Sequence, residues 1–225
     1  MRSDPAILAF DTSAAHCAAA LLFRGEILQA ETREMGRGQA EALMPLLEDV
    51  LEAAHLGWKD LDAIAVGIGP GNFTGIRISV SAARGLALAL GIPAVGVSTF
   101  DLMAYGQTGA ELLVSLPAPR DQVYLQPFHH GTASGPARLA DPATLPGGLG
   151  LEDGGIVTGH RAEEIARSLG AQAAPAELEE IPHRIARIAA ERLAGDGVAP
   201  ERPAPLYVRA ADAAPPSDPP PVILP

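Results

Sequence analysis

The stretch Ala65–Asp101, AVGIGPGNFTGIRISVSAARGLALALGIPAVGVSTFD, decides the fold. It begins inside a short apolar run, Ala63–Ile68, that predicts a buried strand. A glycine loop, Gly67–Gly75, leads from this run into a helix expected over Ile76–Leu90. A second short strand is expected over Ala94–Val97. Because strands joined through a helix pair in parallel, the stretch predicts a parallel strand–helix–strand unit.

Three further strands are expected before this unit. The apolar runs Ala6–Thr12, His16–Phe23 and Glu26–Glu34 follow one another through short connections, which is typical of an antiparallel meander. Apolar residues at intervals of three and four then predict a helix over Ala40–Ala54, which Pro45 either kinks or begins. A short helix after Val97 completes the order β-β-β-α-β-α-β-α. A meander extended by parallel strands favours a ribonuclease H-like half-domain.

The rest of the chain has a weaker pattern. We expect a first lobe over residues 1–106, a reduced second lobe over 107–199 and a proline-rich tail over 200–225 that is extended or disordered. In the second lobe the pattern predicts strands at Leu112–Leu116, Gln122–Phe128 and Ile156–Thr158, an irregular stretch from His130 to Gly150, and helices at Ala162–Leu169 and Arg184–Leu193.

Composition limits the class of protein. The 225 residues carry 16 Lys and Arg against 27 Asp and Glu, so the net charge of −11 argues against a broad surface for nucleic acid. One cysteine, Cys17, excludes a disulfide framework. The apolar run Gly85–Val97 is shorter than the roughly 18 residues of a membrane span, and Asp4 and Asp11 do not fit a secretory signal. We therefore expect a cytoplasmic protein without a membrane partner.

Two loops are candidates for binding an anion. The first is the turn Asp11, Thr12 and Ser13, and the second is the glycine loop, in which Gly69, Gly71 and Asn72 precede a helix. Backbone N–H groups and the positive end of a helix dipole can hold a phosphate there. Both loops also have a purely structural interpretation, as an Asx-type turn and as a tight strand-to-helix connection. Because the turn lacks a glycine, we interpret the pair as a degenerate phosphate loop.

The helix over Ile76–Leu90 is apolar nearly all round. Arg77 and Arg84 are its only charges and lie on one face. Such a helix is covered on more than one side, either by the second half of this chain or by another chain. Both alternatives stay open at this point. If another chain covers it, the candidate contacts are Met44, Leu47, Leu51, Ile78, Ala82, Gly85, Leu86 and Ala89.

Four segments resemble the TsaB family. They are ILAFDTS at Ile7–Ser13, GQAEALMPLLEDVL at Gly38–Leu51, the block Ala65–Asp101, and PLYVRAADA at Pro205–Ala213. GPGNFTGIR, within that block, is the most specific part. The resemblance implies the fold shared by actin, Hsp70 and sugar kinases (the ASKHA fold). That fold is an α/β architecture of two ribonuclease H-like lobes with mixed sheets, and the family's second lobe is reduced.

The resemblance also implies a function. Members of the family are non-catalytic subunits of the bacterial machinery that makes threonylcarbamoyladenosine on tRNA, next to the anticodon. They pair with a catalytic paralogue, TsaD, and the pair recruits an ATPase, TsaE; the older name of this superfamily is glycoprotease-like. TsaD holds a metal through a His-x-x-x-His motif, and Thr99 and Met103 occupy those two positions in this chain. We therefore expect no catalytic centre, no metal and only indirect contact with tRNA.

Two alternatives accompany this interpretation. A small ATPase or sugar kinase of the same fold needs two phosphate loops, and the second lobe offers only Gly154–Gly155 for one of them. A direct tRNA binder fits poorly with the net charge of −11. No cofactor is expected in the isolated chain, although a nucleotide at the junction with the partner is compatible with the sequence. Without its partner the chain could form a homodimer.

Overall fold

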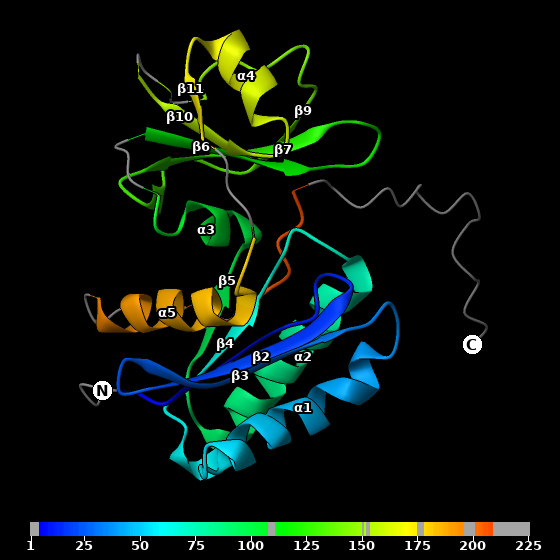
Figure 1. Ribbon diagram of the computed structural model, residues 1–225, viewed down its shortest axis with the longest axis vertical. Helices are drawn as coiled ribbons and strands as arrows, with labels where there is room; N and C mark the ends of the chain where they lie inside the picture. Colours follow the sequence, from blue (N-terminus) through cyan, green and yellow to red (C-terminus); the bar gives the residue numbers. More distant parts are fainter. Residues whose placement is uncertain are drawn as a thin grey trace, which may run out of the picture.

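Two β-sheets, one above the other, form the frame of the computed structural model (Figure 1). The structure describes residues 5–107, 111–149, 151, 154–174, 178–195 and 201–208. Each sheet is the centre of one lobe, and helices lie on both sides of each sheet. The two lobes give the actin/Hsp70-like α/β fold that the sequence predicts.

The first sheet has the predicted meander and the predicted parallel unit. Its strands are β1 (Ile7–Asp11), β2 (His16–Phe23), β3 (Glu26–Glu34), β4 (Ala63–Gly67) and β5 (Ala94–Val97). They lie in the order β3-β2-β1-β4-β5. The pairs β1–β2 and β2–β3 are antiparallel, whereas β1–β4 and β4–β5 are parallel. The meander is therefore one half of the sheet, and the crossover strands are the other half.

Helices cover both faces of this sheet. The helices α1 (Gln39–Ala53) and α2 (Phe73–Leu90) lie side by side on one face, and α5 (Ile181–Ala194) covers the other. Alternate residues of β1 point to opposite faces, so Phe10 packs toward α1 and α2 while Ile7 packs toward α5. This double cover explains why β1 is apolar without a break.

Three helix starts differ from the prediction, and one of them is α5, which begins at Ile181 instead of Arg184. The helix α2 begins at Phe73, three residues before the expected start, because the Asn72 side chain caps it by accepting the Gly75 N–H at 2.9 Å. The helix α1 begins at Gln39 and runs through Pro45, which therefore does not begin the helix. A short 3₁₀ helix, η1 (Trp58–Asp60), separates α1 from β4.

The second sheet repeats the topology of the first. The strand order is β11-β10-β6-β7-β8, and β9 also pairs with β7. The strands β6 and β7 are antiparallel, and β10 pairs in parallel with β6 and β11. The stretch expected to be irregular contains two short strands, β8 and β9. The bounds are β6 (Glu111–Pro117), β7 (Val123–His129), β8 (Thr132–Ala133), β9 (Arg138–Ala140), β10 (Ile156–Gly159), α4 (Ala162–Leu169) and β11 (Gln172–Ala174).

The last helix of each lobe packs on the sheet of the other lobe. The helix α3 (Thr99–Ala104) follows the first sheet, yet Phe100 and Met103 pack on the second sheet against Val114 and Phe128. The helix α5 follows the second sheet and packs on the first. By its packing α5 thus belongs with the first sheet, although it lies within the range 107–199 expected for the second lobe. The outer face of the second sheet carries only α4 among the described helices.

An extended segment, residues 201–208, connects the two lobes, and we call it the strap. The Leu206 N–H donates to the Ile68 carbonyl at 2.8 Å, at the end of β4. Pro203 is buried beside Gly96, and the side chains of Leu206 and Val208 pack against the core between α3 and the second sheet. The described part of the tail is therefore extended, as predicted. Residues 209–225 lie outside the described residues.

Candidate functional site

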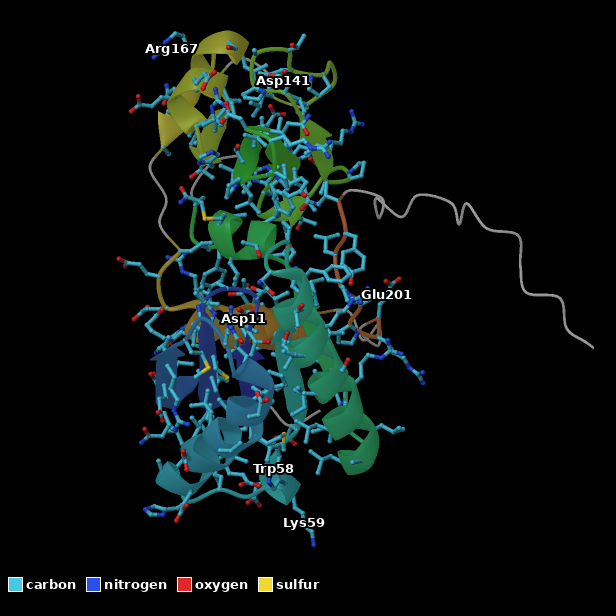
Figure 2. The ribbon with its side chains drawn as sticks, turned by 90° about the vertical axis from the view of Figure 1, so that its right-hand side faces the viewer. Asp11, Trp58, Lys59, Asp141, Arg167 and Glu201 are labelled. Atoms are coloured by element: carbon cyan, nitrogen blue, oxygen red, sulfur yellow. The ribbon has the colours of Figure 1, made fainter. Side chains whose placement is uncertain are left out.

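The two candidate loops lie against each other where the lobes meet. Figure 2 shows Asp11, at the end of β1, in the middle of the molecule. The Asn72 N–H donates to the Ser13 carbonyl at 2.6 Å, and the Thr12 hydroxyl donates to the Gly75 carbonyl at 2.7 Å. The structure thus brings the turn after β1 and the loop after β4 together, as parallel strands that end at one edge must do.

The Asp11 carboxylate organises the first loop. It is 2% exposed, and its Oδ1 accepts hydrogen bonds from the Ser13 N–H at 2.8 Å, the Ser13 hydroxyl at 2.9 Å and the His16 Nε2 at 2.8 Å. The hydrogen bond to Asp11 raises the pKa of His16, and the negative charges of Asp11 and Glu34 add to this effect against the opposing effect of burial. His16 therefore belongs to the loop cluster.

Glycine is required where the two loops touch. A Cβ at Gly67 would overlap the Asp11 carboxylate, and one at Gly75 would overlap the Thr12 carbonyl. At Gly71 the added atom would lie 2.6 Å from the Ser13 carbonyl oxygen. These contacts favour the structural interpretation of the glycine loop, as a close approach of two backbone segments.

The arrangement leaves few donors for a phosphate. The N–H groups of Ser13, Asn72 and Gly75 all donate to acceptors within the chain. In the second lobe the corresponding loop follows β10, where Arg161 donates to the Asp121 carbonyl of the β6–β7 turn at 3.1 Å. Gly154–Gly155 precede β10 and lie at the other end of that strand, so they are not part of this loop. Both pairs of loops are held together by their own hydrogen bonds.

A cavity of about 730 Å³ lies beside the first pair of loops, between the lobes. Its walls are mainly apolar and come from α2, α3, β6, β7 and the strap, including Phe73, Leu102, Leu116, Tyr124 and Leu206. Among the described residues that line it, Arg77 is the only charged one. The cavity therefore has little with which to hold a triphosphate.

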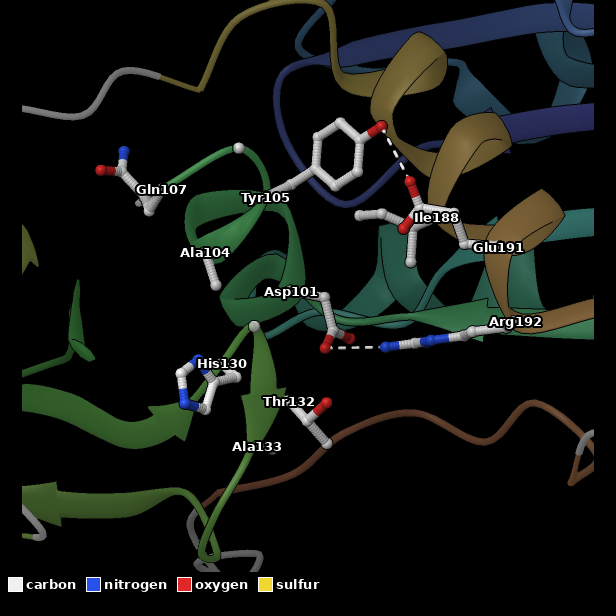
Figure 3. A pocket seen from close by; sticks show the side chains of 12 residues that line it. Asp101, Ala104, Tyr105, Gln107, His130, Thr132, Ala133, Ile188, Glu191 and Arg192 are labelled. Atoms are coloured by element: carbon white, nitrogen blue, oxygen red, sulfur yellow. Dashed lines mark hydrogen bonds and ion pairs between the residues drawn. The ribbon is translucent and has the colours of Figure 1, made fainter. Parts of the chain in front are cut away.

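A larger and more polar cavity, of about 1150 Å³, lies between α3, α5 and the β7–β8 turn (Figure 3). Its charged groups are already paired. The carboxylate of Asp101 lies 2.8 Å from the Arg192 guanidinium, and the Tyr105 hydroxyl donates to Glu191 at 3.2 Å. His130 lines the opposite wall. These pairs fix α5 to α3 and so hold the two lobes in their relative position.

The predicted partner face on α1 and α2 needs a correction. Leu47 is fully buried and Leu51 is 3% exposed, because both belong to the core between these helices and the sheet. The other six candidates reach the surface, fully or in part: Met44, Ile78, Ala82, Gly85, Leu86 and Ala89. Leu88, which is not among the predicted contacts, is 83% exposed. None of the described residues of the second lobe covers this face, which lies on the outside of the molecule (Figure 1).

The positions of the metal-binding motif are used for packing. The Thr99 hydroxyl donates to the Pro70 carbonyl at 2.9 Å, and Met103 is 4% exposed in the core under the second sheet. Within the described ranges, no group of three or more His, Cys, Asp or Glu could hold a metal ion. Cys17 is buried in the first core, and burial raises the pKa of its thiol to about 11.

One described helix, α2, is long and apolar enough to cross a membrane by length and composition alone. Its buried side, which includes Ile76, Val80 and Ala83, packs on the first sheet. Core helices of soluble proteins meet the same criterion, so this composition is weak evidence for a membrane span.

Comparisons with known proteins place these features in a family. A family model described as TsaD, tRNA N6-adenosine threonylcarbamoyltransferase, matches residues 32–135. The tRNA threonylcarbamoyladenosine biosynthesis protein TsaB of Escherichia coli is 37% identical over 122 residues, which are 52% of each chain. An uncharacterized protein of Mycobacterium bovis is 37% identical over 144 residues, 63% of this chain and 68% of that protein. The chain spans about half the length of the curated TsaB relatives that it matches.

A solved structure covers more of the chain. YeaZ from Pseudomonas aeruginosa superposes with a TM-score of 0.66 at 27% sequence identity, over 90% of this chain and 99% of that one. The sequence relatives match the chain in part, whereas this structure matches both lobes.

Proposed function

We propose a function for this chain from one premise: the chain belongs to the TsaB family. It takes part in the biosynthesis of threonylcarbamoyladenosine in tRNA, in the cytoplasm. It is a subunit that performs no chemistry itself and binds a catalytic partner of the TsaD type. The pair then recruits an ATPase of the TsaE type, and tRNA meets this subunit only indirectly.

The exposed apolar face of α1 and α2 is the observation that carries the proposal. Leu88, 83% exposed, and Met44, 38% exposed, lie on helices whose other sides pack on the first sheet. The small residues Gly85 and Ala89 are also exposed and allow a helix to approach closely. Two helices from each protein would form a contact of about 1,600 Å², which is an ordinary specific interface. Without the partner, the same face can pair two copies of this chain.

The proposed mechanism is a shift of population. A subunit that binds only the competent conformation of the partner raises the population of that conformation by its differential affinity. The closed loops support this scaffolding function over that of a small ATPase or sugar kinase. The N–H groups of Ser13 and Asn72 would have to leave their present acceptors before they could bind phosphate. A nucleotide at the junction would then depend mainly on groups of the partner.

Leu88→Glu tests the proposal. The substitution places a charge on the apolar face, so we expect it to abolish co-purification with a TsaD-type partner. Because Leu88 is mostly exposed, the melting temperature should change little. Leu28→Glu is the matched control, since Leu28 is an exposed leucine on β3, at 42%, away from these helices. Unaltered pairing of Leu88→Glu, or equal loss with Leu28→Glu, would contradict the proposal.

Reconstitution of the modification gives the functional readout. With purified partner, ATPase, tRNA and the threonylcarbamoyl donor, modified tRNA should form only when this chain is present. The Leu88→Glu chain should not replace the wild type. Calorimetry of the isolated chain with ATP and magnesium addresses the kinase alternative: micromolar binding with turnover would contradict a subunit that performs no chemistry.

A further inference from the structure

An uninterrupted stretch of this acidic chain carries no carboxylate. From Ala63 to Phe100 there is no Asp or Glu, and Arg77 and Arg84 are the only charges. Both arginines lie on the exposed side of α2. In a chain with a net charge of −11, this flank of α2 is a local region of positive charge.

A groove on that flank brings the two arginines together with the strap. It has a volume of about 300 Å³ and is lined by Arg77, Val80, Ser81, Arg84 and Pro205. At 1.5 Å per residue, the two arginines lie about 10 Å apart along the helix axis. The floor of the groove is partly apolar, and the Ser81 hydroxyl adds a donor between the two guanidinium groups.

The Arg77 guanidinium has a fixed orientation at one end of the groove. Its guanidinium lies 3.7 Å from the centre of the Phe73 ring, and its Nε donates to the Tyr207 hydroxyl at 2.9 Å. The Phe73 and Tyr207 rings are themselves 5.5 Å apart. Stacking and this single hydrogen bond fix the guanidinium plane while its terminal amino groups stay available, which lowers the entropy lost on binding.

Arg84 stands at the other end. Among the residues that the structure describes, no carboxylate forms an ion pair with Arg77 or Arg84. By contrast, Arg33, Arg161 and Arg192 each pair with at least one carboxylate. Other described arginines, such as Arg167, also form no ion pair; Arg77 and Arg84 are distinguished by lining one groove.

We propose that this groove binds an acidic segment of a protein partner, through two carboxylates about 10 Å apart. Two acidic residues seven positions apart on a helix have this spacing, and so do acidic residues about three apart in an extended segment. Each guanidinium donates to a carboxylate in a bidentate arrangement, and Pro205 contacts the apolar atoms between the charges. Two arginines in an acidic chain are too few for the phosphates of RNA, so a peptide is the favoured ligand.

A peptide titration tests this surface without any other subunit. The probe is a fluorescein-labelled 12-residue peptide with Glu at every third position and Ser elsewhere, and its binding to the full chain is followed by anisotropy at low salt. We expect saturable binding, and at least tenfold weaker binding when Gln replaces every Glu. Arg84→Glu should weaken binding at least tenfold, and since Arg84 makes no ion pair with the described residues its fold should be intact.

The control separates a site from general attraction. Arg167→Glu makes the same change of charge at an exposed arginine on α4, at the far end of the second lobe (Figure 2). It should change the affinity less than twofold. Equal weakening by the two substitutions, or no binding by the wild type at millimolar peptide, would overturn the proposal. A single-stranded RNA 12-mer that binds more tightly than the peptide, and loses that binding in Arg84→Glu, would overturn it in favour of nucleic acid.

The proposal does not depend on the apolar face. Met44→Glu places a charge on α1, away from the groove, so it should weaken pairing with the catalytic partner and keep binding to the peptide within about threefold. Leu88→Glu cannot serve here, because it places a carboxylate one helical turn from Arg84. Loss of both interactions in Met44→Glu would show that the groove is not a separate surface, and it would overturn this inference alone.

Discussion

At the scale of single residues, one buried carboxylate determines the local structure of the candidate site. Asp11 accepts three hydrogen bonds on one oxygen, two from Ser13 and one from His16. These bonds fix the turn between β1 and β2, against which the loop before α2 packs. The carboxylate therefore stabilises its own turn.

The hydrogen bond between Asp11 and His16 makes the stability of the protein depend on pH. Because the folded pKa of His16 is raised above its ordinary value, its stabilising contribution is complete below about pH 6.5 and is lost as the pH rises through the folded pKa. We therefore expect His16→Gln to lower the free energy of unfolding by about 1–3 kcal/mol at pH 6. The deficit should shrink toward pH 9, as thermal unfolding at several pH values will show.

An exposed histidine provides the control. His160 lies on the surface after β10, so His160→Gln should follow the wild-type curve across the same pH range. A deficit of constant size from pH 6 to pH 9 in His16→Gln would mean that His16 acts only through packing.

The sequence could not show this residue-scale network. Asp11 and Ser13 are visible as a turn signal, and the structure confirms that they form one. His16 is five residues from Asp11, a spacing without meaning until the chain turns and β2 pairs with β1. The mutual contacts of Gly67, Gly71 and Gly75 with the turn also arise only when segments some sixty residues apart meet.

At the scale of one element, α2 contains two glycines with opposite expected effects. In an exposed helix, replacement of glycine by alanine stabilises by about 1 kcal/mol. At Gly85 an added Cβ meets nothing within 4 Å, so Gly85→Ala should raise the melting temperature. At Gly75 the added atom would overlap the Thr12 carbonyl, so Gly75→Ala should destabilise by more than about 2 kcal/mol.

Chemical unfolding of the two variants measures this difference. Each serves as the control of the other, since both make the same change within one helix. Equal effects would show that the contact between Gly75 and the first turn is not rigid in solution.

The periodicity of apolar residues predicts most helices and strands, but it does not predict the residues at which they begin and end. The apolar stripe of α1 predicts the helix, and the alternation in β3 agrees with a strand that has one exposed face. The predicted start of α2 is three residues late, because the true start depends on capping by the Asn72 side chain and hence on one rotamer. Leu47 and Leu51 share a stripe with Met44 in sequence, and only the packing shows that this stripe faces inward at those two residues.

At the scale of the whole molecule, the strap stabilises the junction of the lobes. Leu206 donates its N–H to Ile68 in the first lobe while its side chain contacts the core of the second. Leu206→Asp would place a charge against that core, and we expect a loss of about 1–3 kcal/mol in unfolding free energy. Limited proteolysis should also cut the variant faster between the lobes.

The neighbouring position separates this effect from a general one. Ala204 is exposed in the same segment, so Ala204→Asp should unfold and digest like the wild type. If the two substitutions behave alike, the strap makes no stabilising contact in solution.

The architecture as a whole was more predictable than its connections. The order of strands and helices predicts the first half-domain, and the resemblance to the TsaB family implies two lobes with mixed sheets; the structure confirms this class. The exchange of α3 and α5 between the sheets did not follow from the sequence. The apolar side of α3 or α5 could pack on an apolar face of either sheet. Only the path of the chain decides which sheet each helix reaches.

That exchange determines how the protein can be made. The inner face of the first sheet, with Ile7, Ala65 and Val95, stays bare until Ile181–Ala194 has left the ribosome. The amino-terminal lobe cannot mature during translation ahead of the other, and a gene cut between the lobes would encode two aggregation-prone halves. Synthesis through α5 must precede a stable first lobe.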